Sequence, residues 1–445
     1  MTPKQLGQSV MMRAVASRWL PKVVHLVWEG MRLAKREPHK VHYFHQMDDP
    51  YSFLTAQALK PLLETYRVEL VPHLVGPPSD ENAPERRLLK RWARRDAADV
   101  ASQYGLEFTD RGEDLSPTVV HVSQRILASA APKDFPGWAL AVSRAAWGRD
   151  HGVLKALSKK FLKVDAPGLE AEILEATELR DKLGHFAGAT FFFGGEWYWG
   201  VDRLIHLENR LDSMGLTRPG QKAPLFERAR EFVPQRTDAS ALTLEAFVSV
   251  RSPYSAIAMP RIMDLVREAK LNLVVRPVLP MVMRGVPAPT VKGLYLMQDA
   301  KREADYQGVP FGKIMDPVGR PVERAYSLFG WARNQKKEAA YIYACLEAAF
   351  MQGIDLGSKA GMQQVLENAG LVWDQGKVLL GNDEWCDEIE KNRKRMYKLG
   401  LWGVPSFRLS GPAGERDYVT WGQDRLWRVA QEVARRAPVQ TAKAS

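Results

Sequence analysis

The sequence is poor in the residues that hold a fold together through covalent bonds or metal ions. Only two cysteines, Cys345 and Cys386, occur among 445 residues, far apart and outside any C-x-x-C pair. This spacing indicates neither a disulfide framework nor a zinc site. All nine histidines lie at or before His206. The second half therefore has no imidazole base, and a Ser-His-Asp triad cannot be assembled from it alone.

Long hydrophobic runs are also absent. No segment approaches the run of about 18 apolar residues that a membrane-spanning helix needs, and Arg13 and Arg18 interrupt any secretory apolar region. A hydrophobic content of 45% and a charged content of 26% are ordinary for a soluble protein. We expect a cytoplasmic protein, because the cysteine usage suits a reducing compartment. The lack of acidic residues before Glu29 leaves an organellar matrix as the alternative.

The net charge of +11 is concentrated at the start of the chain. Residues 1–40 hold eight Lys or Arg against two Glu, and apolar residues at helical spacing between Val10 and Lys35 are interrupted by Pro21. The pattern predicts a basic arm of two short helices, packed on the body or on a second subunit. Peripheral contact with a membrane is the alternative. No nucleic-acid motif accompanies the charge, so we expect no nucleic-acid partner.

The same pattern opens each half of the chain. A short strand leads into a Pro-Tyr-Ser turn, then a helix and then a second strand, which is a β-α-β start. A proline in the first helical turn, preceded by Asp or Ser, is a strong signal for a helix start. The strands are predicted at 41–44 and 68–75 in the first half and at 244–248 and 271–279 in the second, with the turns at 50–52 and 253–255.

Each half also closes on the same pattern. A β-hairpin is followed by Trp-Gly-x-Asp-Arg-Leu, at Trp199–Leu204 and again at Trp421–Leu426. A long region of helical pattern separates start from end in both halves. The sequence therefore predicts an internal duplication. We expect an arm at 1–40, a first domain at 41–211 with a helical insert at about 79–180, a linker at 212–241, a second domain at 242–436 with an insert at about 287–398, and a flexible tail at 437–445.

Five motifs in the second half occur in a recognisable order. They are Ser252-Pro253-Tyr254-Ser255, Lys292–Leu296 with Asp299, Ala349-Phe350 through Asp355, Gly403-Val404-Pro405, and Gly422–Arg425. With these motifs, residues 242–436 resemble the kappa-class glutathione transferases and the 2-hydroxychromene-2-carboxylate isomerases of the DsbA-like thioredoxin superfamily. The first half resembles them more distantly, at Asp49–Ser52, Ala146–Asp150 and Gly200–Arg203. The resemblance implies an α/β fold of two tandem thioredoxin-like (DsbA-like) domains, each with a large α-helical insertion.

The resemblance also implies a glutathione site. Ser252 would be the catalytic residue, donating to the glutathione thiolate at a helix N-terminus, where the dipole favours negative charge. The backbone of Val404, before a cis Pro405, would pair with the cysteinyl part, and Asp424, with Gln423 beside it, would receive the γ-glutamyl amino group. The structural alternatives are helix caps for Ser252 and Asp424 and an ordinary trans proline at 405. No metal site is expected.

Two positions depart from the family pattern in the second half. Arg251 stands directly before Ser252, where it would either stabilise the thiolate or displace glutathione. The loop Met283–Pro287 lacks the Asn that the family places there.

The first half departs further from the pattern. Asp49 stands at the Ser position, where a carboxylate repels a thiolate, and Ala189 stands at the cis-proline position. We expect the first half to be silent toward glutathione but to keep a pocket lined by Trp197, Trp199 and Asp202.

The leading hypothesis is a glutathione-dependent isomerase or transferase. It would act on an aromatic or conjugated small molecule through the second domain, in a chain that is a monomeric pseudo-dimer or a homodimer. The alternative is a non-catalytic thioredoxin-fold binding or scaffold protein of the same superfamily. A thiol-disulfide oxidoreductase is not expected, because no Cys pair stands at either helix start.

Overall fold

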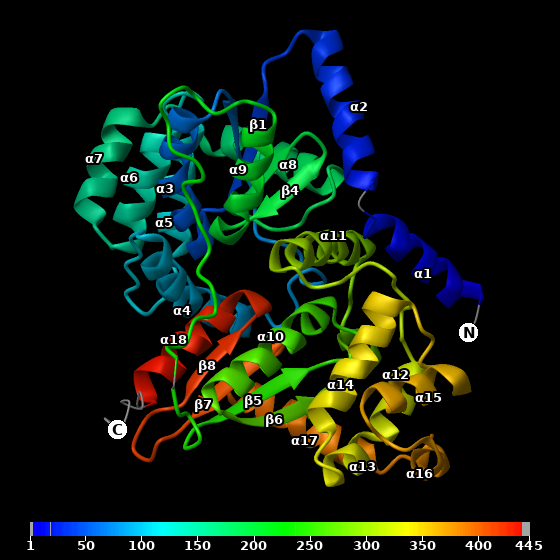
Figure 1. Ribbon diagram of the computed structural model, residues 1–445. Coiled ribbons are helices and arrows are strands. Elements are labelled where there is room, and N and C mark those ends of the chain that lie inside the picture. The colour runs from blue at the N-terminus through cyan, green and yellow to red at the C-terminus, as the bar shows by residue number, and fades with distance from the viewer. Residues whose placement is uncertain (1–2, 18, 236, 438–445) are drawn as a thin grey trace. The chain divides into compact units, whose positions relative to one another are not determined.

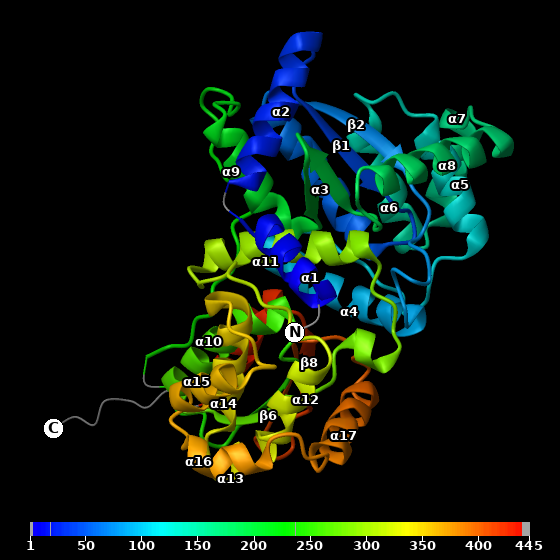
Figure 2. The ribbon, with the colours of Figure 1, turned by 90° about the vertical axis from the view of Figure 1, so that its right-hand side faces the viewer.

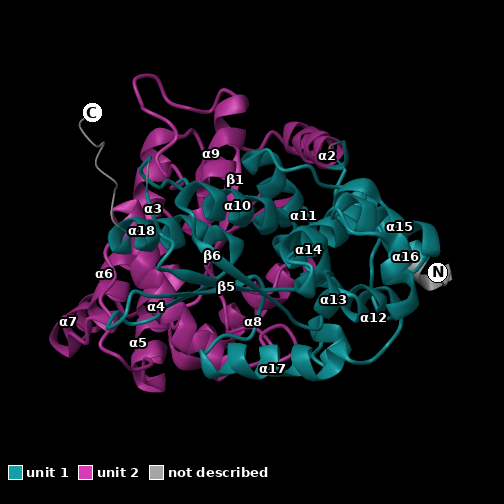
Figure 3. Ribbon diagram, turned by 60° about the horizontal axis from the view of Figure 1, so that its bottom comes forward, with its two compact units in different colours: residues 1–20, 230–445 teal, residues 21–229 magenta. Residues whose placement is uncertain are grey.

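The computed structural model describes residues 3–17, 19–235 and 237–437, which form two compact units (Figure 3). Unit 1 comprises residues 1–20 and 230–445, and unit 2 comprises residues 21–229. The basic segment 1–40 is thus divided between the units, and the boundary near residue 230 falls inside the expected linker. From residue 438 on, the expected tail lies outside the described residues.

Unit 2 contains a four-stranded sheet in the order β2-β1-β3-β4. Figure 1 labels β1 and β4 of this sheet. The first two strands pair in parallel and are joined by α3, whereas β3 and β4 form an antiparallel hairpin. Five helices, α4 to α8, are inserted between β2 and β3. The elements are α2 Leu20–Lys35, β1 Lys40–His45, α3 Pro50–Thr65, β2 Glu69–Leu74, α4 Arg86–Tyr104, α5 Pro117–Ala128, α6 Phe135–Trp147, α7 His151–Phe161, α8 Ala166–Lys182, β3 Thr190–Phe193, β4 Glu196–Trp199 and α9 Leu204–Ser213.

Unit 1 contains a sheet of the same order, β6-β5-β7-β8. Here α10 joins the two parallel strands, and helices α11 to α17 are inserted before the terminal hairpin. The elements are α1 Pro3–Val15, β5 Thr243–Val248, α10 Pro253–Ala269, β6 Asn272–Pro277, α11 Thr290–Gln307, α12 Arg320–Ser327, α13 Phe329–Asn334, α14 Glu338–Glu347, α15 Lys359–Asn368, α16 Trp373–Gly376, α17 Trp385–Lys398, β7 Ser406–Ser410, β8 Tyr418–Trp421 and α18 Leu426–Arg436.

The helix that follows the first strand of each sheet makes the same side-chain contacts in both units. Tyr51 Oη donates to Asp96 Oδ2 at 2.7 Å in unit 2, and Tyr254 Oη donates to Asp299 Oδ2 at 2.7 Å in unit 1, each pair 45 positions apart. A serine hydroxyl in the first turn also accepts the backbone N–H of the residue six positions earlier, in both units. The two units therefore share contacts between side chains as well as sheet order.

The two N-terminal helices pack separately. In unit 1, α1 lies beside α11 (Figure 2), the Ser9 and Ala16 side chains are buried, and Arg13 Nε donates to Ile314 O at 2.6 Å. In unit 2, the α2 ring of Trp28 meets Phe192 edge-on at 5.3 Å between centroids. Pro21 lies in the first turn of α2, where its missing N–H costs no hydrogen bond, so the two helices are distinct elements.

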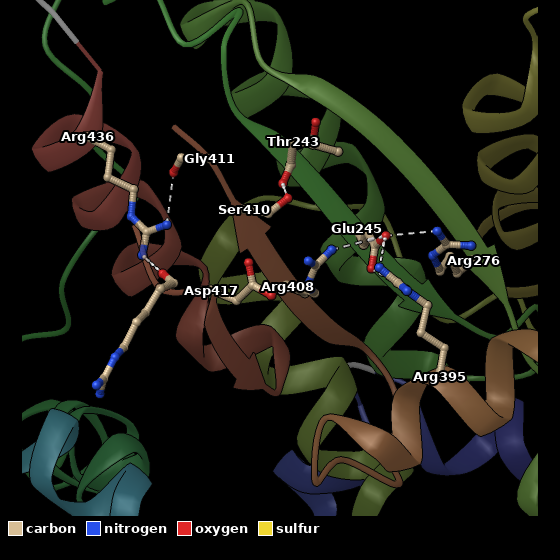
Figure 4. A network of polar contacts seen from close by, with 10 residues as sticks. Thr243, Glu245, Arg276, Arg395, Arg408, Ser410, Gly411, Asp417 and Arg436 are labelled. Carbon is tan, nitrogen blue, oxygen red and sulfur yellow. Dashed lines mark hydrogen bonds and ion pairs between the residues drawn. The ribbon is translucent and has the colours of Figure 1, made fainter. Parts of the chain in front are cut away.

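A charged residue lies inside the sheet of unit 1. Glu245 in β5 is 4% exposed, and its carboxylate accepts hydrogen bonds from Arg276 on β6 and Arg395 on α17, while Arg408 on β7 lies 3.4 Å away (Figure 4). A buried carboxylate is tolerated only with such partners. Burial opposes its ionisation, but the hydrogen bonds from Arg395 and Arg276 outweigh burial and lower the pKa of Glu245.

Candidate functional site

Ser252 is the N-cap of α10. Its Oγ accepts the backbone N–H of Ser255 at 3.1 Å, and the backbone is extended at φ −91° and ψ 118°. A hydroxyl group that accepts one hydrogen bond still has a proton to donate. The helix-cap alternative is therefore realised without excluding the expected role, because capping and donation to a bound thiolate use different parts of the hydroxyl. The dipole of α10 adds partial positive charge at this point.

The loop before β7 lies at the same end of the sheet. The Val404–Pro405 peptide bond is cis, and the next residue, Ser406, pairs with Phe247 near the carboxyl end of β5, a few residues before α10 begins. Within the described chain, neither the N–H nor the C=O of Val404 makes a backbone hydrogen bond. Val404 thus offers both a donor and an acceptor, which is what pairing with an extended peptide requires.

Gly403 fits the loop against an aromatic ring. A Cβ at this position would lie 2.4 Å from the indole of Trp421, so only glycine allows the approach. The Ser406 hydroxyl donates to Gly403 O at 2.7 Å, and Gly422 N donates to Pro405 O at 2.9 Å. These contacts tie the loop to the turn that follows β8.

Arg251 is bound by an acidic residue of the same unit. Its Nε and Nη2 donate to the two carboxylate oxygens of Asp316, at 2.7 and 2.8 Å, in a bidentate pair. Asp316 is buried, and its backbone N–H donates to Ser9 Oγ on α1 at 3.1 Å. A bidentate carboxylate compensates the guanidinium charge. Arg251 was expected either to stabilise a thiolate or to displace glutathione. Because Asp316 balances its charge, Arg251 has little charge left to act on a thiolate.

Gln423 and Asp424 lie in a 3-10 turn, Gln423–Arg425, directly after β8. The Gln423 amide is buried and occupied at both ends, since its oxygen accepts from Arg261 Nη1 and its nitrogen donates to Glu303 Oε2 at 2.8 Å. Its nitrogen also donates to Asp424 Oδ1. Gln423 therefore positions Asp424, and both of its amide N–H groups are already used.

The predicted site residues are brought to one edge of unit 1. Ser252 and Arg251 follow β5, Val404 and Pro405 precede β7, and the Gln423–Arg425 turn is linked to Pro405 through Gly422. Sequence reasoning missed Asp316, Glu303 and Arg261, because partners far apart in the chain carry no local signal.

The corresponding edge of unit 2 has different chemistry. Asp49 caps α3 by accepting the backbone N–H groups of Tyr51 at 3.3 Å and Ser52 at 3.1 Å. Burial, with the nearby Asp48 carboxylate, raises the pKa of Asp49 to about 7. Ala189 accepts from Gly200 N at 2.8 Å, as Pro405 does from Gly422, but it has a φ of 55° and no cis bond.

A cavity of about 100 Å³ lies at this edge of unit 2. Its wall includes Asp49, Trp147 and Trp199, but the prediction that Trp197 and Asp202 line it is wrong. The Trp197 indole packs on Phe44 at 5.1 Å and donates to Leu183 O at 2.9 Å, and Asp202 accepts from Tyr104 Oη at 3.2 Å.

Sequence reasoning also missed the basic side of this cavity. Arg86, Lys90 and Arg94 on α4 all line it. Their spacing of four residues places them on one face of a helix, and this spacing was the available signal.

No cluster of metal-binding side chains is present among the described residues. His42 and His45 lie on opposite faces of β1, since His42 contacts His73 at 2.9 Å whereas His45 contacts the Tyr43 hydroxyl. No helix in the described part of the chain has the length and apolar character needed to cross a membrane.

The sheet order and the cis-proline loop define residues 243–434 as a thioredoxin-type domain, and comparison with known families agrees. Residues 243–434 match the family described as DSBA-like thioredoxin domain. No curated protein matches the chain.

Several solved structures are similar to part of this chain. A 2-hydroxychromene-2-carboxylate isomerase is 20% identical, with a TM-score of 0.36, and the match covers 43% of this chain and 95% of that one. The cytosolic disulfide reductase DsbM from Pseudomonas aeruginosa, solved with GSH, is 19% identical, with a TM-score of 0.33, covering 43% and 97%. A probable DsbA oxidoreductase from Streptomyces coelicolor is 15% identical, with a TM-score of 0.35, covering 46% and 94%.

Proposed function

We propose that unit 1 binds glutathione and uses its thiolate in an isomerase or transferase reaction on an aromatic or conjugated small molecule. The observation that carries the proposal is that Ser252, at the N-terminus of α10, and the cis Val404–Pro405 loop lie at the same edge of the unit 1 sheet. The cysteinyl part would pair with the backbone of Val404, and the sulfur would lie toward the Ser252 hydroxyl. Asp424, held by Gln423, would receive the amino group of the γ-glutamyl part.

The chemistry follows from a stabilised thiolate. The sulfur adds to one carbon of a conjugated double bond, and the π electrons move onto the conjugated carbonyl oxygen. Rotation about the resulting single bond precedes cleavage of the C–S bond, which restores the double bond and the thiolate. No oxidant or reductant is consumed. The helix dipole and the Ser252 donor assist by lowering the pKa of the bound thiol.

We further propose that the two units arose by duplication and diverged in function. The shared sheet order and the paired Tyr51–Asp96 and Tyr254–Asp299 contacts support a common origin. Unit 2 is proposed to be silent toward glutathione, because Asp49 supplies a carboxylate where Ser252 supplies a hydroxyl. A kappa-type relationship, which the sequence motifs suggest, belongs to the same proposal.

The test is calorimetry of glutathione binding in buffers of different ionisation enthalpy, which counts the protons released. A thiol bound as thiolate at neutral pH should release close to one proton per complex, since a free thiol of pKa about 8.5 is mostly protonated. Ser252→Ala should release markedly less.

Ser358→Ala is the matched control for this measurement. Ser358 caps α15 with the same geometry, accepting from Gly361 N at 2.9 Å. Each substitution should cost about 1 kcal/mol of stability through the lost cap, but only Ser252→Ala should change the proton count. Equal proton release by wild type and Ser252→Ala would show that Ser252 is a cap alone.

The second candidate is a non-catalytic binding protein of the same fold. Two observations favour it. In unit 1, Arg251 and Gln423 already bind Asp316 and Glu303, and unit 2 contains a cavity. Under this candidate glutathione would not bind, and Ser252→Ala would leave cellular function unchanged.

The proposal places the protein in the cytoplasm with small molecules as its partners. Glutathione is plentiful in reducing compartments. Cys345 and Cys386 are both free thiols.

A further inference from the structure

The cavity of unit 2 has the dimensions and wall of a small-molecule site. Its volume of about 100 Å³ is of the order of the roughly 150 Å³ cavity that holds a benzene ring. Leu89, Leu115 and the two indoles of Trp147 and Trp199 supply an apolar surface. Asp49 and α4 supply charged groups, so the wall combines a hydrophobic body with a few polar groups, as ligand sites do.

The cavity wall contains hydrogen-bond donors that lack acceptors. Trp147 is 3% exposed, and its indole N–H has no acceptor within the described chain. The same holds for Nε and Nη1 of Arg94, whose neighbouring carboxylates Asp114 and Asp110 lie 3.5 and 3.9 Å away, beyond hydrogen-bond length. Buried donors of this kind are uncommon and call for an acceptor.

The basic face of α4 favours an anion as that acceptor. Arg86, Lys90 and Arg94 are neighbours at i, i+4 and i+8, so their like charges repel one another. Lys90 is partly compensated by Asp48 at 3.2 Å, and Arg86 by the exposed Asp80 at 2.8 Å. Arg94 forms ion pairs with Asp114 and Asp110 but hydrogen-bonds to neither, and its planar guanidinium matches the two oxygens of a carboxylate.

We propose that this cavity binds a short-chain monocarboxylate of about four to six carbons. Its carboxylate lies against Arg94 and Trp147, and its alkyl chain lies against Leu89 and Leu115. The site is independent of glutathione and of Ser252.

The test is binding of pentanoate to the full-length protein, followed by calorimetry and by saturation-transfer NMR, with pentan-1-ol as the uncharged comparison. Pentanoate should bind at least tenfold more tightly than pentan-1-ol, because only the carboxylate engages the guanidinium. This comparison needs no variant. Absence of pentanoate binding, or equal binding of the alcohol, overturns the proposal.

Variants locate the site. Arg94→Met keeps an unbranched apolar stem, removes the guanidinium and should weaken pentanoate binding by about 10- to 100-fold, as loss of a charged hydrogen bond predicts. Arg91→Met, on the exposed side of the same helix, is the matched control and should leave binding unchanged. Trp147→Phe keeps a smaller aromatic ring, removes the N–H, and should weaken binding several-fold. Ser252→Ala should bind pentanoate as wild type does. Unchanged binding in folded Arg94→Met contradicts the proposal.

Discussion

The N-cap residue of the first helix after β1 differs from that after β5: it is Asp49 in unit 2 and Ser252 in unit 1. Asp49 and Ser252 both cap their helices through backbone N–H groups. An ionised carboxylate can only accept hydrogen bonds, whereas a hydroxyl also donates one. Under the proposed function, the same backbone geometry would favour a thiolate beside the Ser252 hydroxyl and disfavour one beside an ionised Asp49.

The ionisation of Asp49 should control anion binding in unit 2. Its pKa of about 7 is raised by burial, so below pH 7 the carboxyl is neutral and above pH 7 it repels a bound carboxylate. Affinity for pentanoate should rise several-fold from pH 8 to pH 6, and Asp49→Asn should remove this dependence. Calorimetry at each pH measures it, and equal wild-type affinities at pH 6 and pH 8 would refute the assignment. The other charged groups that line the cavity are Asp48, Arg86, Lys90, Arg94 and Asp114.

Single residues were predictable where the chemistry is local. Ser252 before a proline and the Val404–Pro405 pair carry their signals in neighbouring residues. Gln423 hydrogen-bonds to Glu303, and Arg251 pairs with Asp316. Both contacts depend on folding of the insert, so no local sequence pattern encodes them. Trp197 was assigned to the pocket from its neighbourhood in the sequence, yet its indole is held by Leu183 O and the Phe44 ring.

At the scale of elements, β5 is held in its sheet by charge as well as by hydrogen bonds between strands. Glu245 binds guanidinium groups from β6 and α17 and lies close to a third from β7 (Figure 4). The network joins the inserted helix α17 to the sheet that carries the site.

Glu245→Gln should lower the free energy of unfolding by about 2–4 kcal/mol, because two or three guanidinium groups lose their shared carboxylate. This expected loss of unfolding free energy is smaller than that for breaking a fully buried ion pair, because the Arg395 side chain is 41% exposed. Since the pKa of Glu245 is lowered on folding, its stabilisation is present above the ordinary value of 4.5 and is lost as the pH falls through the lower folded value. Urea unfolding at pH 7 and pH 3 measures both effects.

Glu390→Gln is the control for this prediction. Glu390 forms an exposed pair with Arg393 one turn away on α17. Its loss should cost no more than about 0.5 kcal/mol. If the two variants were equally stable, the network would have no special role in the fold.

The elements of both sheets were predictable, and the inserted helices were not. The strand patterns at 41–44 and 244–248 fall within β1 and β5, and the helix starts at Pro50 and Pro253 agree with α3 and α10. The helical inserts were expected only as regions. Amphipathic spacing gives helices but not their partners, which are set by packing between distant segments.

At the scale of the whole molecule, two units of similar topology carry different chemistry. Neither has a pair of cysteines at its helix start. Cys345 is buried, and burial raises the pKa of its thiol to about 12, while Cys386 is exposed on α17.

We expect no disulfide-reductase activity from this protein. In an insulin-precipitation assay the full-length chain should not exceed the background rate of the reductant alone. A thiol of pKa near 12 is not a nucleophile at neutral pH, and Cys386 has no partner cysteine beside it. Activity that disappears in Cys386→Ser would contradict this expectation.

The most direct test of the central claim is a crystal structure of the full-length protein soaked with glutathione. The structure should show glutathione in unit 1, paired with the Val404 backbone, with its sulfur within hydrogen-bond distance of Ser252 Oγ and its amino group at Asp424. Unit 2 should hold none at the Asp49 edge. Glutathione in unit 2, or in neither unit, would contradict the claim.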